Sequence, residues 1–198
     1  MDSKRVIIFG VTGQDGSYLA DLLLDKEEYD VLGVKRRSST NTEERIAHLK
    51  DNKNFHLVEG DIVDFNSVNE IIKEYNPHHI YNLAAQSHVG TSFKQPTYTF
   101  QVNTLGVLNI LESIRNFDTD IRFYQASTSE MFGNNTVQNT RIIHQDEQCC
   151  PVHGNPNNEN MVSYSIPYQD ENTKFEPASP YLSLIHISEP TRQAAISY

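Results

Sequence analysis

The sequence predicts an α/β fold built on a doubly wound parallel sheet, and two observations lead to that prediction. Over the first 125 residues, short runs of apolar and β-branched residues alternate with longer amphipathic stretches, which is typical of successive strand–helix–strand units. A glycine-rich turn also joins the first apolar run to the first amphipathic stretch. Right-handed crossovers would place all of these strands parallel in one sheet.

The first strand–helix–strand unit is the clearest. Residues 5–9 are nearly all apolar, as expected of a strand that is buried on both faces. Residues 17–25 are predicted to form a helix whose apolar side carries Leu19, Leu22 and Leu23, and residues 30–34 form the next strand.

Two further units follow the first. The second has a strand at 55–58, a helix at 68–75 and a strand at 79–83. The third has a helix at 98–114, with Leu105, Leu108 and Leu111 at three-residue steps, and a strand at 121–125. Five strands are thus expected in one sheet.

Composition restricts the classes of function. A chain of 198 residues with 37% hydrophobic residues can bury one sizeable core. A net charge of −10 opposes polyanionic partners such as nucleic acid or a membrane surface. The two cysteines are adjacent and cannot form a disulfide framework, and no apolar run approaches the roughly 18 residues of a membrane span. We expect a soluble, cytoplasmic protein.

Residues 134–176 have a different character from the rest. They are rich in Asn, Gln, Asp, Pro and Tyr and lack both hydrophobic periods, so we expect an insertion or loop that follows a nucleotide-binding domain at 1–133. His144, Cys149, Cys150 and His153 could suggest zinc. Adjacent cysteines fit no usual zinc spacing, however, and no metal site is predicted.

The glycine-rich turn predicts a phosphate-binding site. Gly10, Gly13 and Gly16 are spaced three apart between a strand and a helix. In a Rossmann fold the first glycine allows the bend, the second lets the backbone approach a pyrophosphate, and the third allows close helix packing. An ordinary glycine turn is the alternative. The strand before the turn and the helix after it favour binding of a dinucleotide.

The segment after the second strand indicates which dinucleotide. NAD-binding proteins usually place an acidic residue there, whereas this chain has Lys35, Arg36 and Arg37 followed by Ser38 and Ser39. These cations suit the 2′-phosphate of NADP, although a solvated basic stretch is the alternative. After the third strand, Asp61 could reach the adenine or could serve a turn or helix cap.

Four motifs carry a family resemblance. GVTGQDGSYLA, KRRSS, YNLAAQSHV and FYQASTSEMFG resemble those of the extended short-chain dehydrogenase/reductases and, within them, the GDP-mannose 4,6-dehydratase family. The resemblance implies that NADP is lined by Gly10, Val11, Thr12, Gly13, Gln14, Asp15, Gly16, Arg36, Arg37, Ser38, Ser39, Asp61, Ile62, Leu83, Ala84, Ala85, Gln86, Ser87 and Tyr98.

The resemblance also implies a reaction. In that family GDP-mannose is oxidised at C4 by NADP⁺, water is eliminated from C5 and C6, and the hydride returns to C6, which gives GDP-4-keto-6-deoxymannose on the route to GDP-fucose. By the match, Thr128 would polarise the C4 oxygen, Glu130 would be the C5 base and elimination acid, and Tyr181 the base for hydride transfer. Without the resemblance, residues 127–129 would be a Ser/Thr turn and Glu130 a surface charge. The complete protein is expected to be a homo-oligomer.

The pattern breaks after Tyr181. The family has a lysine four residues later, where this chain has Ile185. The following LSLIHISEPTR resembles a translated sequencing adaptor, so we expect 177–181 to begin the catalytic tyrosine helix and 182–198 to be a non-native tail. The sheet would then be incomplete, the substrate domain missing and the chain itself inactive. Another nucleotide-sugar dehydratase or epimerase, or a non-catalytic NADP-binding module, remains the alternative.

Overall fold

The structure is a computed structural model that describes residues 3–117, 120–133, 137–144, 161–168 and 173–181. The chain divides into two compact units. The first consists of Met1–Thr128 and Ser179–Tyr198, and the second of Ser129–Ala178. The predicted tail at 182–198 lies outside the described residues.

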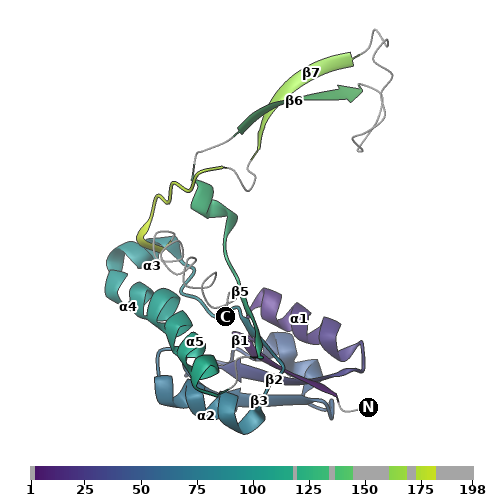
Figure 1. Cartoon of the computed structure of the whole chain (residues 1–198), viewed down its shortest axis with the longest axis vertical. Helices are drawn as coiled ribbons and strands as arrows, with labels where there is room; N and C mark the ends of the chain where they lie inside the picture. The colour runs from purple at the N-terminus through teal and green to yellow at the C-terminus, as the bar shows by residue number, and fades with distance from the viewer. Residues whose placement is uncertain (1–2, 118–119, 134–136, 145–160, 169–172, 182–198) are drawn as a thin grey trace. The chain divides into compact units, whose positions relative to one another are not determined.

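A five-stranded parallel sheet forms the centre of the first unit (Figure 1). Its strands run in the spatial order β3-β2-β1-β4-β5, and every neighbouring pair is parallel. The predicted doubly wound α/β fold is therefore confirmed, and the five strands lie where the apolar runs indicated. They are β1 (Lys4–Phe9), β2 (Tyr29–Lys35), β3 (Phe55–Glu59), β4 (His79–Asn82) and β5 (Arg122–Gln125).

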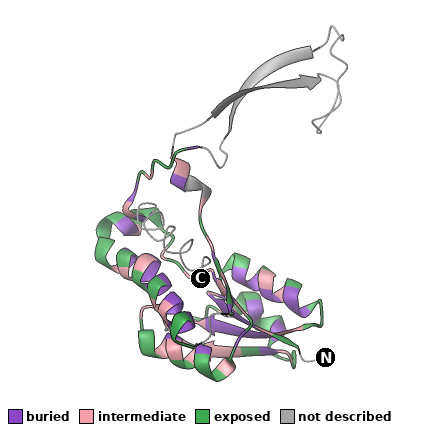
Figure 2. Cartoon of the chain, viewed as in Figure 1, coloured by how far each residue is buried: buried purple, intermediate pink, exposed green. Residues whose placement is uncertain are grey.

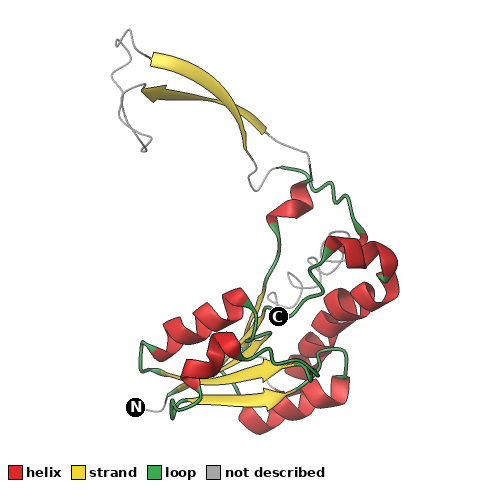
Figure 3. Ribbon diagram, turned by 180° about the vertical axis from the view of Figure 1, so that it is seen from behind, coloured by secondary structure: helices red, strands yellow, loops and turns green. Residues whose placement is uncertain are grey.

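Helices lie on both sides of this sheet (Figure 3). One face packs against α1 (Gln14–Leu24) and η1 (Glu44–Leu49), and the other against α2 (Phe65–Tyr75) and α5 (Gly106–Phe117). Along β1 the side chains alternate between the two faces, so Val6 and Ile8 join one core cluster while Ile7 and Phe9 join the other. All four are almost fully buried, which explains the unbroken apolar run; Figure 2 shows buried residues on the strands of the sheet and on the helices beside it.

The predicted helix faces are partly wrong. Leu22 on α1 is 55% exposed, and Leu105 and Leu108 are exposed as well. A helix has 3.6 residues per turn, so residues at three-residue steps drift by about 60° per step and leave the buried face. Leu23 and Leu111 are buried as predicted, and the other residues that face the sheet are Ala20 and Leu24 on α1, and Val107, Ile110 and Ile114 on α5.

The third predicted helix is a continuous helical run of three segments. It comprises α4 (Pro96–Phe100), the π-helical segment η2 (Gln101–Leu105) and α5, and the N–H of Gly106 bonds to the carbonyl of Gln101. Before it lies α3 (Val89–Lys94), which is capped by the His88 ring. No helix in the described ranges is both long and apolar enough to cross a membrane.

The second unit contains a β-hairpin. Its strands β6 (Val137–His144) and β7 (Met161–Tyr168) pair antiparallel, where the sequence led us to expect a loop. Near the start and end of this unit, the N–H of Glu176 donates to the carbonyl of Met131 over 2.9 Å. That the segment is an insertion stays a prediction, and Cys149, Cys150 and His153 lie outside the described residues.

Candidate functional site

The turn after β1 is so close to its neighbours that two of its glycines have no room for a side chain. Gly10 has a φ of +81°, and a Cβ there would lie 2.8 Å from the backbone nitrogen of Ala84. A Cβ on Gly16 would overlap the carbonyl oxygen of Gly10 and lie 2.8 Å from the Cα of Val11. Gly10 is therefore required where the turn passes the end of β4, and Gly16 where α1 packs on the turn.

Gly13 has a different place in the same turn. It directly precedes α1, and no side chain caps the helix there. Gly13, Gln14 and Asp15 are exposed, and the first N–H groups of a helix have no partners within it. Together with the helix dipole, these groups can bind an anion such as a pyrophosphate. The buried Val11 side chain packs in the core, so only its backbone is available to a ligand.

The lysine and the two arginines at the end of β2 have different surroundings. Lys35 is neutralised by carboxylates, whereas Arg36 and Arg37 line a pocket. The Lys35 ammonium lies 2.7 Å from a carboxylate oxygen of Glu43 and 3.3 Å from one of Glu59. Hydrogen bonds to Glu43 and then Glu59 raise the pKa of Lys35, while bonds from Lys35 and Lys50 lower the pKa of Glu43 to about 2. Lys35 thus joins β2 to β3 and to the start of η1.

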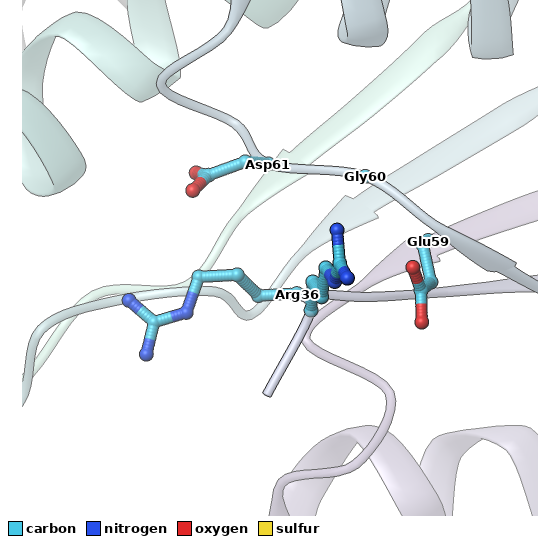
Figure 4. Close-up of a pocket in the computed structure, with 5 residues that line it drawn as sticks. Arg36, Glu59, Gly60 and Asp61 are labelled. Carbon is cyan, nitrogen blue, oxygen red and sulfur yellow. The ribbon is translucent and has the colours of Figure 1, made fainter. Parts of the chain in front are cut away.

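The two arginines line a pocket at the carboxyl ends of β2 and β3. The pocket has a volume of about 420 Å³ and is lined by Arg36, Arg37, Glu59, Gly60 and Asp61. Figure 4 shows Arg36 beside the segment that carries Glu59, Gly60 and Asp61. Arg36 also donates to the hydroxyl of Tyr98 on α4, so two predicted site residues from different elements meet here.

Asp61 makes a local turn and also lines the pocket, while its contact with the adenine stays a prediction. One carboxylate oxygen accepts the N–H of Val63 over 3.0 Å, which is an Asx turn, and the residue also lines the pocket. The cap of α2 is Asp64, which accepts the N–H of Asn66. Ile62 is only 5% exposed and packs in the core, so a ligand would meet its backbone rather than its side chain.

The loop after β4, residues 83–87, is held by buried amides. Asn82 is fully buried; it donates to Gln125 over 2.8 Å and accepts the N–H of Ala84 over 3.2 Å. Further along, Gln86 donates its N–H to Asn103 and accepts a hydrogen bond from the same side chain. These bonds fix the course of a loop that passes directly beside Gly10.

The remaining predicted cofactor residues lie at the surface or half-buried. The Ser38 hydroxyl accepts the N–H of Thr40 in a local turn, and Ser39, Ala85 and Ser87 are exposed. Thr12, Leu83 and Tyr98 are half-buried. Sequence reasoning missed Thr99, Asn103 and Asn109, because no local pattern signals a polar contact to a distant loop.

The three predicted catalytic residues fall in different units. Thr128 is half-buried and is the last residue of the first segment of the first unit, Met1–Thr128. Tyr181 is buried and belongs to the same unit. Glu130 belongs to the second unit, within η3 (Ser129–Phe132), and its side chain is outside the described part of the structure. Their catalytic roles stay predictions.

The doubly wound sheet and its glycine turn define the class of protein: an α/β protein with a Rossmann fold. Within that class, a family model described as GDP-mannose 4,6 dehydratase matches residues 7–153. The chain therefore belongs to the GDP-mannose 4,6-dehydratase family.

Individual relatives agree with this assignment. The chain is 46% identical over 140 residues to GDP-mannose 4,6-dehydratase of Vibrio cholerae serotype O1, a match that covers 67% of this chain and 37% of the relative. It is 42% identical over 187 residues to the enzyme of the same name from Sinorhizobium fredii. That match covers 91% of this chain and 45% of the relative. The chain thus spans less than half the length of these curated relatives.

Solved structures support the fold. A UDP-Glc/GlcNAc 4-epimerase from Campylobacter jejuni has a TM-score of 0.73 at 19% identity, covering 98% of this chain and 49% of its own. A dTDP-glucose 4,6-dehydratase from Bacillus anthracis, in complex with NAD, has a TM-score of 0.71 at 20% identity. The match covers 98% of this chain and 50% of the dehydratase chain. At these identities the likeness concerns the fold alone.

Proposed function

We propose that this chain is the NADP-binding part of a GDP-mannose 4,6-dehydratase, an enzyme that converts GDP-mannose to GDP-4-keto-6-deoxymannose and water. The observation that carries the cofactor proposal is the pair Arg36 and Arg37 in a pocket beside Gly60 and Asp61. Family membership supports the substrate. A cytoplasmic, homo-oligomeric protein is part of the same proposal and rests on composition and resemblance.

The cofactor part of the proposal fits the shape and charge of the site. A side chain at Gly10 or Gly16 would collide with backbone, so the turn keeps its exposed amide groups where a pyrophosphate can approach. Lys35 is neutralised by two carboxylates, whereas Arg37 has no hydrogen bond or ion pair to another described residue. Arg37 is accordingly the cation that is free to pair with a 2′-phosphate.

The catalytic part concerns three residues of the family motif. When bound, NADP supplies the hydride acceptor for transient oxidation of the sugar. Thr128 donates a hydrogen bond to the C4 oxygen, and Tyr181 takes the proton of the C4 hydroxyl. Glu130 then takes the C5 proton and protonates the departing C6 hydroxyl, and return of the hydride to C6 with a proton at C5 would complete the net loss of water.

A binding experiment tests the choice of cofactor. Titration of the purified chain with NADP⁺ and with NAD⁺ is expected to show tighter binding of NADP⁺. Arg37→Ala should weaken binding of NADP⁺ about tenfold, because one charge-assisted bond to phosphate is lost, and leave NAD⁺ binding unchanged. Arg122→Ala, at the amino end of β5, is the matched control. Equal binding of both cofactors by the unaltered chain contradicts the proposal.

A turnover experiment tests the catalytic part. We propose that this chain alone does not turn over GDP-mannose, because Ile185 occupies the position of the family lysine, and because more than half the length of the relatives is not represented. Incubation with GDP-mannose and NADP⁺ should give no 4-keto product by mass spectrometry. The longer protein should give it, and its Glu130→Gln variant should not; product from that variant would exclude the proposed role of Glu130.

A further inference from the structure

One helical run contacts three of the four segments that line the candidate site. The run consists of α4, η2 and α5, and its contacts reach the segments after β2, β3 and β4. Tyr98 meets Arg36 after β2. Asn109 bonds to the segment after β3, and Thr99 and Asn103 bond to the loop after β4. Apart from Tyr98, none of these helical residues belongs to the predicted cofactor contacts.

Asn103 holds the loop after β4 with both halves of its amide group. Its Oδ1 accepts the backbone N–H of Gln86 over 2.8 Å, and its Nδ2 donates to the carbonyl of Gln86 over 3.1 Å. Asn103 is only 4% exposed, so no water competes for these bonds. The Gln86 side chain also donates to Thr99, which is fully buried, over 3.1 Å. The backbone at Gln86 is thus fixed against the helix from two sides.

Asn109 holds the loop after β3 in a different way. Its Nδ2 lies 2.8 Å from the carbonyl oxygen of Ile62 and 3.1 Å from that of Val63. Gly106, one turn earlier, leaves room for the Ile62 side chain, whose Cδ1 would lie 2.7 Å from a Cβ at that position. The Asn109 bonds fix the backbone that directly follows Asp61, a residue that lines the arginine pocket.

The two loops serve different halves of a dinucleotide. In a doubly wound sheet the dinucleotide lies across the carboxyl ends of the strands, and its pyrophosphate sits at the turn after the central strand. The order β3-β2-β1-β4-β5 places Asp61 on the side of the arginine pocket, where the adenosine and its 2′-phosphate would lie. Gln86, after β4, is on the opposite side of β1, where the nicotinamide half would lie.

We propose that Asn103 and Asn109 are positioning residues for the cofactor, each for a different half: Asn109 for the adenosine 2′-phosphate and Asn103 for the nicotinamide half. Neither contacts the cofactor itself. Each acts by holding a loop backbone at the correct distance from the glycine turn. This inference rests on the proposed binding of NADP. In addition, one helical run holds the loops after β3 and β4 at fixed positions relative to each other.

Two ligands separate these roles from a general effect on folding. NADP⁺ occupies both halves of the site, whereas adenosine 2′,5′-bisphosphate occupies only the half beside Arg36 and Arg37. Asn109→Leu, which leaves the carbonyls of Ile62 and Val63 unpaired, should weaken binding of both ligands about tenfold. Asn103→Ala should weaken NADP⁺ about tenfold and leave the bisphosphate within about twofold, because the loop after β3 keeps its position. Both are measured by calorimetric titration.

Two further variants sharpen the test. Asn116→Ala, at an exposed position of α5, is the control and should bind both ligands like the unaltered chain. Asn103→Asp keeps an acceptor for Gln86 N–H but cannot donate to its carbonyl, so it should behave like Asn103→Ala. If both Asn103 variants lose the two ligands equally, or bind NADP⁺ normally, the inference is wrong. If the unaltered chain binds neither ligand, the proposed cofactor site itself fails.

Discussion

The glycines of the turn after β1 have separate physical roles. Gly10 combines a positive φ with a close approach to Ala84, and Gly16 sits directly against the backbone of Gly10 and Val11. Gly13 has an ordinary φ of −72°, and the closest approach to its added Cβ is 3.2 Å, from the carbonyl oxygen of Gly10. Two of the glycines are therefore required by the fold, whereas the third is less crowded and lies where the proposed cofactor would approach.

Alanine substitutions distinguish these roles. Gly16→Ala should lower the free energy of unfolding by about 1–3 kcal/mol, because its Cβ overlaps backbone that cannot move aside. Gly13→Ala should change the stability little and weaken binding of NADP⁺, because its Cβ would stand where the pyrophosphate approaches. Urea denaturation and cofactor titration of both variants measure the two effects. A stable Gly16→Ala protein would contradict the packing argument.

At the scale of elements, a chain of ion pairs connects β2, β3 and η1. Glu43 lies at its centre, with ammonium groups of Lys35 and Lys50 each 2.7 Å from its carboxylate. These bonds lower the pKa of Glu43 from 4.5 to about 2. Glu43 therefore stabilises the fold fully above about pH 4.5, and this contribution is lost as the pH falls towards 2.

The pH dependence of Glu43→Gln tests that link. At pH 7 the variant should melt at a lower temperature than the unaltered chain, because both lysines lose their charged partner. The difference should become smaller as the pH falls below about 4.5 and should also shrink at high salt, since the pairs are partly exposed. Thermal melts at pH 7 and pH 3.5 measure it. A difference that grows on acidification would exclude the ion-pair explanation.

Local patterns predicted the elements well but not their contacts. Runs of apolar and β-branched residues placed all five strands, and the run at β1 is unbroken from Val6 to Phe9 because this part of the strand is buried on both faces. Leucines at three-residue steps misplaced part of the buried face of α5, since 3.6-residue periodicity moves Leu108 to the surface. On α1 the predicted face included Leu22, which is exposed, beside Leu23, which is buried.

In the candidate site too, the features that depend on neighbouring residues were predicted, and the contacts between distant residues were not. The glycine turn and the two arginines are local patterns, and the sequence predicted both. The amide contacts of Asn103 and Asn109 join residues 17 and 47 positions apart, so only the tertiary fold reveals them. The hairpin β6–β7 was missed for a related reason, because its pairing partners are far apart in a polar segment.

At the scale of the whole molecule, the first unit contains two hydrophobic core clusters. Among the residues whose side chains the structure describes, both clusters are drawn from residues between Val6 and Ile121. The first unit has its own sheet, both of its helical layers and the whole arginine pocket. Cofactor binding should therefore be a property of this unit alone.

Removal of the hairpin tests that independence. A chain in which residues 137–168 are replaced by a short Gly-Ser linker should melt cooperatively and bind NADP⁺ with unchanged affinity, because the five-stranded sheet, both core clusters and the pocket are built from residues of the first unit. Calorimetry measures both quantities. Loss of the cooperative transition would show that the second unit is needed for the first to fold.

The contact between Gly10 and Ala84 also sets an order of events during synthesis. The first βαβ unit leaves the ribosome with β1 paired on one side only, since β4 is encoded more than 70 residues after β1. The turn is enclosed only when the chain at Leu83 and Ala84 arrives beside it. A nascent chain that ends before this point holds all three glycines and both arginines but no completed site. Cofactor capture should therefore report, in a cell-free translation series, the moment at which β4 docks.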